Sequence, residues 1–133
     1  MNYFLDTNIC IYLINQHPIE LIEKFRKFEP FEIGLSTIVV SELAYGVAKS
    51  TRSKQNQKRL EQFLMPFQIV PYDHAAAQAY GLIRADLEAK GTPIGREDLL
   101  IAAHAHSFGV PLVTNNEKEF LRVEGLRVEN WVV

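Results

Sequence analysis

The sequence has one cysteine, no long hydrophobic run and no excess of basic residues. Its 133 residues include 14 Lys and Arg against 16 Asp and Glu, for a net charge of −2. Cys10 cannot form an internal disulfide, so nothing indicates an oxidising compartment, and its apolar neighbours predict a buried side chain. No apolar stretch approaches the ~20 residues of a membrane-spanning helix, and Asp6 follows Met1 too closely for a signal peptide. We therefore expect a soluble, cytoplasmic protein with no membrane partner.

Other absences exclude whole classes of function. A near-neutral charge argues against a protein that binds nucleic acid by bulk electrostatic attraction alone. The sequence has no Walker loop and no dinucleotide-binding glycine fingerprint. Its four histidines form no zinc-ligand pattern, and none of its serines lies in a nucleophile elbow. The length fits one domain, residues 1–133, which is large enough to bury an ordinary core.

Short apolar runs alternate with helical patterns along the chain. We predict strands at residues 3–5, 31–35, 68–70, 112–114 and 126–128. Helices are expected at residues 7–14, 18–27, 36–47, 73–90 and 96–108, with a short one from residue 117. Residues 49–59 are expected to form a turn and the start of a further helix that ends near residue 64. This order predicts an α/β fold, a three-layer α/β/α sandwich around a mainly parallel sheet of four or five strands.

Two of these elements carry more specific predictions. The helix at residues 18–27 is expected to bury a stripe formed by Ile19, Ile22, Phe25 and Phe28. The helix that begins at Arg96 is apolar on nearly every side and is expected to be a core helix.

Three acidic residues lie at positions that a parallel sheet brings to one edge. This edge, beyond the carboxyl ends of the strands, is where such sheets bind ligands. Asp6 directly follows the first strand, although capping the next helix would explain it equally well. Asp98 lies in the first turn of a core helix, where the helix dipole alone favours an acid. Glu42 lies at the border of an apolar helix face, where a carboxylate is costly unless it is paired or metal-bound, although most glutamates are simply solvated.

Two more polar residues follow the strand at residues 112–114. Asn116 comes first and Glu119 lies one helical turn later, although an asparagine here can simply cap the short helix. Clustered carboxylates repel one another and raise one another's pKa unless a cation joins them. Mg²⁺ is the natural partner, since it takes one or two carboxylates together with water and a substrate phosphate.

The segment Lys49–Arg59 contains five basic residues and no acid. A solvated helix or turn is its ordinary interpretation. If the segment borders the acidic crevice, it can instead hold the phosphate backbone of a nucleic acid.

The ordered motifs resemble those of a PIN domain, and more narrowly a VapC-type ribonuclease toxin of a type II toxin–antitoxin pair. They are Leu5-Asp6-Thr7-Asn8, Ser41-Glu42-Leu43, Gly95-Arg96-Glu97-Asp98 with the apolar residues to Ala103, and Leu112-Val113-Thr114-Asn115-Asn116 with Glu119-Phe120. The resemblance runs in order over nearly the whole chain. It implies a small α/β/α sandwich whose acidic cluster binds Mg²⁺ or Mn²⁺.

The resemblance also implies residue roles. Asp6, Glu42 and Asp98 correspond to the first three family acids and would hold the metal. The fourth family acid, often aspartate, appears here as Asn116. Glu119, one turn later, can supply the missing charge, and Asn116 can still coordinate the metal through its amide oxygen or orient water. Metal-activated water would then cleave RNA, leaving a 5′-phosphate and a 3′-hydroxyl, and an unstacked region such as a tRNA loop is the expected substrate.

The implied partners are proteins as well as RNA. Family members usually form homodimers and are silenced by a VapB-type antitoxin whose C-terminal segment covers the active-site groove. The helices around Glu42 and Leu64 would form part of that groove. Operator DNA would be contacted only through the antitoxin complex.

Two alternative functions remain open from the sequence. Asn116 favours a PIN-fold module that binds RNA or protein with weakened catalysis. A small-molecule phosphate hydrolase on the same type of sheet is the other alternative. Asn8 argues against it, because aspartyl phosphatases usually have a second Asp at that position, and the chain also lacks a phosphate-binding loop.

Overall fold

Five short strands form one sheet in the order β3-β2-β1-β4-β5, and every neighbouring pair is parallel. In this computed structural model, which describes residues 1–133, the strands are β1 (Tyr3–Leu5), β2 (Ile33–Ser36), β3 (Gln68–Val70), β4 (Leu112–Val113) and β5 (Val128–Glu129). The predicted parallel sheet is confirmed. Because β1 is central, the residue that follows it stands at the middle of the carboxyl edge.

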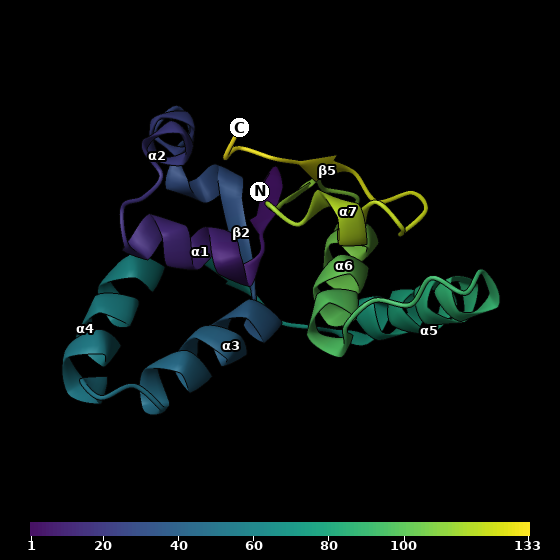
Figure 1. The fold of residues 1–133 in the computed structure, drawn as a ribbon, viewed down its shortest axis with the longest axis horizontal. Helices are drawn as coiled ribbons and strands as arrows, with labels where there is room; N and C mark the ends of the chain where they lie inside the picture. The colour runs from purple at the N-terminus through teal and green to yellow at the C-terminus, as the bar shows by residue number, and fades with distance from the viewer.

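Helices cover both faces of the sheet and complete the predicted three-layer sandwich (Figure 1). They are α1 (Thr7–Ile14), α2 (Ile19–Phe25), α3 (Thr37–Ala48), α4 (Ser53–Leu64), α5 (His74–Ala89), α6 (Arg96–Phe108) and α7 (Glu117–Phe120). Figure 1 shows α1, α2 and α4 on one side of the sheet and α5 and α6 on the other. Helix α5 packs along α6, and α3 contacts α1, α4 and α6.

The core is formed by the central strands and the helices packed on them. Phe4 and Leu5 of β1 are completely buried, as are Ala102 and Ala103 of α6. The predicted core helix is therefore confirmed, and Cys10 is buried as expected. Burial of this apolar surface, at about 25 cal/mol per Å², is the main force that holds the helices against the sheet. None of the helices combines the length and the apolar character needed to cross a bilayer.

Three local predictions differ from the structure. A 3₁₀ turn (Pro30–Glu32) replaces the start of the strand predicted at residues 31–35, because proline fixes φ and Glu32 bonds back to the Glu29 N–H at 2.8 Å. Helix α2 ends at Phe25 and buries Leu21 and Ile22, whereas Ile19 is exposed. The last strand begins at Val128, because the chain before it is still turning.

Candidate active site

Asp6 lies directly after β1 and is almost fully buried. Its Oδ1 atom accepts a hydrogen bond from the backbone N–H of Ile9 at 2.9 Å and thereby caps helix α1. Its Oδ2 atom accepts a hydrogen bond from the hydroxyl of Thr114, the residue after β4. The helix-capping role considered from the sequence is therefore real. It leaves the carboxylate with further lone pairs for a ligand at the sheet edge.

Glu42 is held at the same edge by a residue of another helix. It lies on α3, which begins after Ser36 at the end of β2, and the Ser36 hydroxyl accepts the N–H of Ile38 at 3.1 Å. The Thr7 hydroxyl donates a hydrogen bond to Oε1 of Glu42. Since Thr7 directly follows Asp6, this bond joins the two acid-bearing segments. Glu42 is half-buried, at the border position that the apolar pattern predicted.

Asp98 and Glu119 approach each other across the loop that precedes α6. Gly95 is the N-cap of α6, and its N–H donates to Oε1 of Glu119 at 2.8 Å. A Cβ atom placed on Gly95 would lie 3.8 Å from Glu119 Oε1 and 4.0 Å from Asp98 Oδ2. Both carboxylates therefore lie close to the Gly95 backbone, at the start of α6.

Asn116 and Glu119 form one unit. Asn116 occupies the N-cap position of α7, yet its side chain does not cap the helix. Its Nδ2 atom donates instead to Oε2 of Glu119 at 2.8 Å, while its own N–H donates to the Thr114 hydroxyl oxygen at 2.9 Å. Because Thr114 also bonds to Asp6, a continuous chain of hydrogen bonds runs from Asp6 to Glu119.

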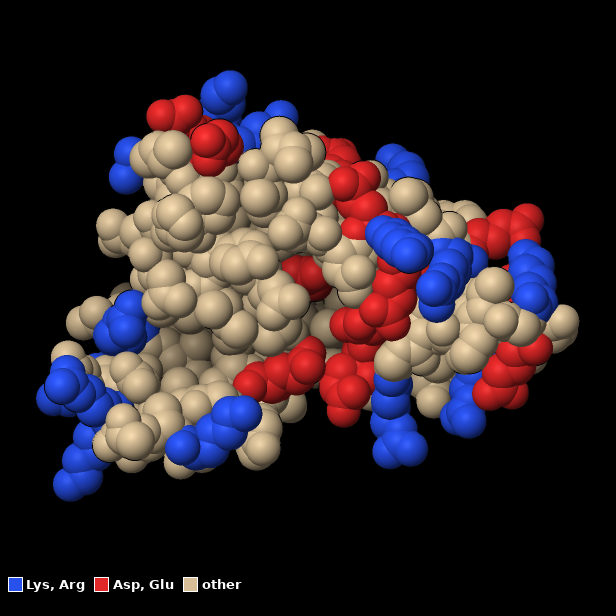
Figure 2. Space-filling model, viewed as in Figure 1, with Lys and Arg blue, Asp and Glu red and all other residues tan.

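The acids concentrate negative charge at one place. Figure 2 shows acidic side chains gathered through the middle of this face, with basic side chains beside them and toward both ends. The pKa of Asp98 is raised to about 7. Burial is the largest cause, followed by the charge of Glu119 and its hydrogen bond to Asp98, and then by the charges of Asp6 and Glu42. Burial also raises the pKa of Asp6, against the hydrogen bonds from Thr114 and Ile9. The Gly95 N–H lowers the pKa of Glu119. The negative charges of the other three predicted acids thus all act on Asp98.

The donor set fits a hard divalent cation. It consists of carboxylate oxygens and one amide group, and burial together with the neighbouring negative charges raises the pKa of Asp98, a cost that a bound cation would offset. Nowhere in the chain do three His, Cys, Asp or Glu side chains form a ready-made metal cage. This openness agrees with Mg²⁺, which usually takes one or two protein carboxylates and fills its other positions with water and substrate phosphate.

Sequence reasoning missed the groups that position these acids. Thr114 is completely buried and Thr7 is half-buried, and each donates its hydroxyl to a carboxylate of the site. The signal for Thr114 was present, since it ends a predicted strand at the ligand-binding edge. The role of the Gly95 N–H had no signal, because it depends on a fold that brings α7 beside the α6 N-terminus.

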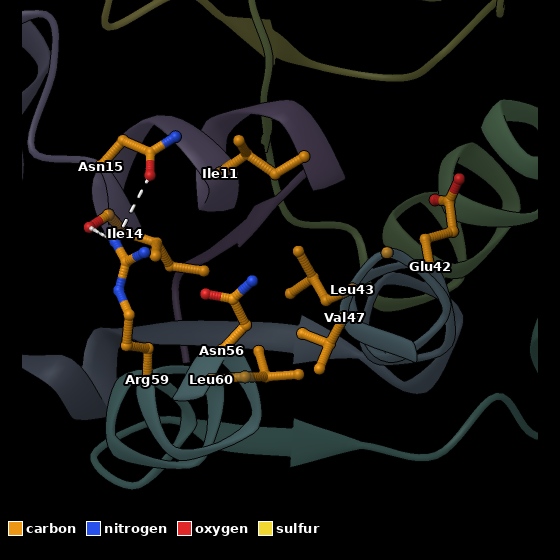
Figure 3. Close-up of a pocket in the computed structure, with 10 residues that line it drawn as sticks. Ile11, Ile14, Asn15, Glu42, Leu43, Val47, Asn56, Arg59 and Leu60 are labelled. Carbon is orange, nitrogen blue, oxygen red and sulfur yellow. Dashed lines mark hydrogen bonds between the residues drawn. The ribbon is translucent and has the colours of Figure 1, made fainter. Parts of the chain in front are cut away.

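A groove extends from Glu42 between α1, α3 and α4 (Figure 3). Its volume is about 240 Å³. Its walls are largely apolar and are formed by Ile11, Ile14, Leu43, Val47 and Leu60, with Asn15, Glu42, Gly46, Asn56 and Arg59 completing the lining. Arg59 bonds to the Ile14 carbonyl at 3.3 Å and to the Asn15 side chain at 3.4 Å.

The basic segment 49–59 begins at Lys49, the C-cap of α3, and continues through a turn into the first half of α4. None of its five cations makes an ion pair within the chain. Lys49 lies over the Tyr45 ring, with its Nζ atom 4.9 Å from the ring centroid. Asn56 and Arg59 of the segment line the groove that begins at Glu42, whereas Asp6, Asp98 and Glu119 lie outside its lining, so the phosphate-binding role stays a prediction.

Comparison with known proteins identifies the family. Residues 3–126 match the PIN domain model. The chain is 46% identical to "Ribonuclease VapC2" of Rickettsia felis, over 98% of each protein. It is 41% identical to "tRNA(fMet)-specific endonuclease VapC" of Shigella flexneri, again over 98% of each protein.

Solved structures agree with the sequence matches. A chain of DNA-bound VapBC from Salmonella typhimurium superposes with a TM-score of 0.93 at 40% identity, over 98% of both chains. A chain of VapBC2 from Rickettsia felis, bound to a promoter DNA fragment, superposes with a TM-score of 0.88 at 45% identity, over 98% of this chain and 99% of that one. The acids that converge at the carboxyl edge thus lie in a fold and a sequence shared with nucleases, and this chain is a PIN-domain protein of the VapC ribonuclease family.

Proposed function

We propose that this protein is a metal-dependent endoribonuclease toxin that cleaves phosphodiester bonds of loop RNA and is inhibited by a VapB-type antitoxin. The ribonuclease activity follows from membership of the VapC family. The metal, the site residues and the type of RNA are the parts that we infer. One observation supports them most: Glu119, Asp6 and Glu42 converge on the half-buried Asp98, and its burial, followed by their negative charges, raises the pKa of Asp98 to about 7.

In the proposed site, Asp6 and Asp98 would hold Mg²⁺ or Mn²⁺, and Glu42 would complete the site directly or through water. The metal would supply the charge that polarises the scissile phosphate and lowers the pKa of the attacking water. Cleavage adds this water across the P–O3′ bond, leaving a 5′-phosphate and a 3′-hydroxyl.

The chain's other residues position these ligands. The hydroxyl of Thr114 and the N–H of Ile9 fix both oxygens of Asp6, and Thr7 fixes Glu42. Rigid placement matters because a shift of about 1 Å in a reacting group lowers the rate of an enzyme by roughly 100-fold.

Asn116 and Glu119 complete the acidic cluster. Their mutual hydrogen bond and the Gly95 N–H hold the Glu119 carboxylate beside Asp98. We propose that Glu119 provides the charge that Asn116 lacks, with Asn116 as its support. This pairing argues against a module whose catalysis is weakened by Asn116, since the negative charge is retained one helical turn away.

Loop RNA is the proposed substrate, because the edges of paired bases are hidden in an A-form helix. The relative from Shigella flexneri is named for tRNA(fMet), which makes a tRNA loop the first RNA to test. We propose that the unpaired cations of segment 49–59 contact its phosphates.

The antitoxin is the proposed protein partner. Similar chains have been solved in VapBC complexes, two of them with DNA, so we infer an antitoxin complex that contacts operator DNA through the antitoxin. The groove between α1, α3 and α4 suits its C-terminal segment, since its walls are apolar and one end reaches Glu42. We also propose that the protein forms a homodimer, which sedimentation would detect, and that it acts in the cytoplasm.

The central experiment is cleavage of a tRNA-loop RNA with and without Mg²⁺, using the wild-type protein and the variants Asp6→Asn and Asp98→Asn. We expect metal-dependent cleavage by the wild type and at least a roughly 100-fold loss in each variant. Circular dichroism checks that both variants fold. Equal cleavage by folded variants would contradict the site, and RNA binding without cleavage by the wild type would favour a binding module. Release of phosphate from small esters would favour the small-molecule hydrolase.

A further inference from the structure

A second cavity lies between α5 and α6, on the far side of the loop that borders the acids. Its volume is about 270 Å³, and the proposed chemistry uses none of its residues. Its lining consists of Tyr80, Arg84, Leu87, Glu88, Pro93, Ile94, Arg96 and Leu99. Leu87 and Leu99 are nearly completely buried and form an apolar floor.

One wall of this cavity is an ordered polar edge on α5. The Arg84 Nη1 atom donates to the Tyr80 hydroxyl at 3.1 Å, and its Nε atom donates to Glu88 at 3.0 Å. The three side chains therefore restrain one another along one face of the helix. They present an aromatic ring, a guanidinium plane and a carboxylate to one small space, which is the set of groups that stack on bases and bond to their edges.

The opposite wall is shared with the acidic site. Pro93 and Ile94 line the cavity, while the next residue, Gly95, donates to Glu119 in the site. Arg122 holds this loop from the α7 side, with Nη1 donating to the Pro93 carbonyl at 2.9 Å. One loop therefore contributes residues to the cavity and a hydrogen bond to the acidic site, which makes the two neighbours.

Arg96 supplies a free positive charge at this cavity. It is exposed, makes no ion pair or side-chain hydrogen bond, and precedes Asp98 by two residues. The acids repel the phosphates of an approaching RNA, so a cation beside them favours the approach of the backbone. An apolar floor, a stacking wall and an unpaired cation are together complementary to a nucleotide.

We propose that this cavity binds one unstacked base of the substrate RNA, that of a nucleotide adjoining the scissile phosphate, and that Arg96 contacts a phosphate of the same nucleotide. The inference rests on the proposed function and adds a specificity site to it. The volume suits one base, because it is slightly below the roughly 300 Å³ at which pockets for larger drug-sized ligands begin.

The test is a cycle that combines RNA and protein changes. Cleavage by the wild type first locates the scissile bond in an unpaired RNA, and two further RNAs then carry an abasic nucleotide on either side of that bond. Values of kcat/KM are measured for the wild type, Ile94→Ala and Arg96→Ala. The matched controls Ile19→Ala and Arg26→Ala remove an exposed side chain of the same kind from α2 and its C-terminal end.

We expect one of the two abasic RNAs to lower kcat/KM of the wild type by about 10-fold, the size of the effect when one base no longer stacks on the protein. The same RNA should lower kcat/KM of Ile94→Ala by less than about 3-fold, because that variant already lacks the packing surface for the base. Arg96→Ala should raise KM and weaken the salt dependence of KM, and the controls should match the wild type.

Other outcomes distinguish a failure of the base-binding cavity from a failure of the proposed ribonuclease function. Equal losses on the abasic RNA in the wild type and in folded Ile94→Ala, or no loss on either abasic RNA, overturn the base site and leave the ribonuclease intact. Failure of the wild type to cleave any RNA in Mg²⁺ overturns the proposed function and the base site with it. Thermal melts and gel filtration of every variant establish that fold and oligomeric state are unchanged.

Discussion

Glu119 and Gly95 lie 24 positions apart in the sequence, yet the Glu119 carboxylate accepts the Gly95 N–H at 2.8 Å. This bond fixes the carboxylate of α7 beside the first turn of α6, where Asp98 lies. Without it, two carboxylates of like charge would tend to separate. The fold therefore stabilises an arrangement that electrostatics alone disfavours, and its consequences are measurable.

The first prediction concerns stability against pH in the absence of metal. The pKa of Asp98 is about 7 in the folded protein and near 4 when unfolded, so the folded state binds more protons between these values and stability falls as pH rises through this window. The pKa of Asp6 is shifted in the same direction. Burial lowers the pKa of His104, which acts in the opposite direction, so the Asp98 contribution is measured by urea denaturation in EDTA at pH 5 and pH 8 of the wild type against a variant that lacks the Asp98 charge.

The variant Asp98→Asn isolates this contribution. It should stabilise the metal-free protein at pH 8 by about 1–2 kcal/mol, a figure reduced for solvent screening because Asp98 is only half-buried. At pH 5 the difference from the wild type should be smaller. The Gly95 N–H lowers the pKa of Glu119, so the ionised Glu119 stabilises the folded protein at both pH values. This stability is lost only as the pH falls below the ordinary pKa of a glutamate. An Asp98→Asn protein that is equally destabilised at both pH values would contradict the electrostatic account.

The second prediction concerns metal binding. A proton on Asp98 competes with the cation, so Mg²⁺ affinity should rise as pH increases through about 7 and should level off above pH 8. Titration calorimetry in two buffers of different ionisation enthalpy should detect proton release at pH 6.5. Glu117→Gln serves as a control, since Glu117 is an exposed acid of α7 whose side chain bonds to Asn130. A pH-independent affinity would sink this prediction.

The third prediction concerns Thr114, the buried donor to Asp6. Thr114→Val keeps the shape and removes the hydroxyl, so it should destabilise the protein by about 1–2 kcal/mol and raise the pKa of Asp6 further. Cleavage should fall by roughly 10-fold at pH 7. Thr114→Ser retains the donor and should keep most of the activity. Kinetics and denaturation of both variants test the role, and equal loss in the two would point to packing instead.

The fourth prediction separates charge from positioning in the Asn116–Glu119 pair. Glu119→Gln keeps an acceptor for the Gly95 N–H but removes the charge, so the pKa of Asp98 should fall toward its ordinary value. Asn116→Ala keeps the charge and removes its support. We expect Glu119→Gln to lower Mg²⁺ affinity by roughly 10-fold or more and Asn116→Ala to lower it less.

The measurement is Mg²⁺-dependent cleavage, with the concentration of metal at half-maximal rate as the readout. The opposite order of the two variants would assign the main role to Asn116. Retention of wild-type metal dependence in both would remove the pair from the site.

The fifth prediction concerns the basic segment. Lys54→Ala and Lys58→Ala remove cations on α4 that make no ion pair. Each should weaken binding of single-stranded RNA, and the slope of log K against log salt should become less steep by about 0.7 for each phosphate that the variant no longer neutralises. Lys27→Ala, an exposed cation just beyond α2, is the control. An unchanged slope in the α4 variants would indicate a solvated helix face.

Much of the fold was predictable because local patterns and the global architecture agree. Alternation of apolar runs with helical periods was enough to predict a parallel sheet, and Gly109 ends α6 in the left-handed conformation as a helix-terminating glycine does. The errors lie where a local backbone constraint overrides the apolar pattern. At residues 30–32 the proline and the Glu29–Glu32 capping box replace the first residues of the expected strand with a 3₁₀ turn.

The candidate site was predicted in part for a similar reason. Asp6 and Asp98 were identifiable because each has a fixed place relative to a strand end or a helix start. The sequence did not indicate how Asn116 and Glu119 share their role, since their hydrogen bond depends on the turn of α7. It also did not reveal Thr7 and Thr114 as donors, because threonine is common at such positions in proteins without a site.

By itself, the sequence determined the order of strands and helices, the apolar faces that bury them and the set of acids available at the strand ends. Periodicity and residue type are local properties, so they can be read along the chain. Only the tertiary structure decided which acids meet, that Gly95 and Asn116 hold Glu119 beside Asp98, and that a cavity opens behind the same loop. Those relationships join segments far apart in the chain, and their energies depend on distance and burial that no local pattern specifies.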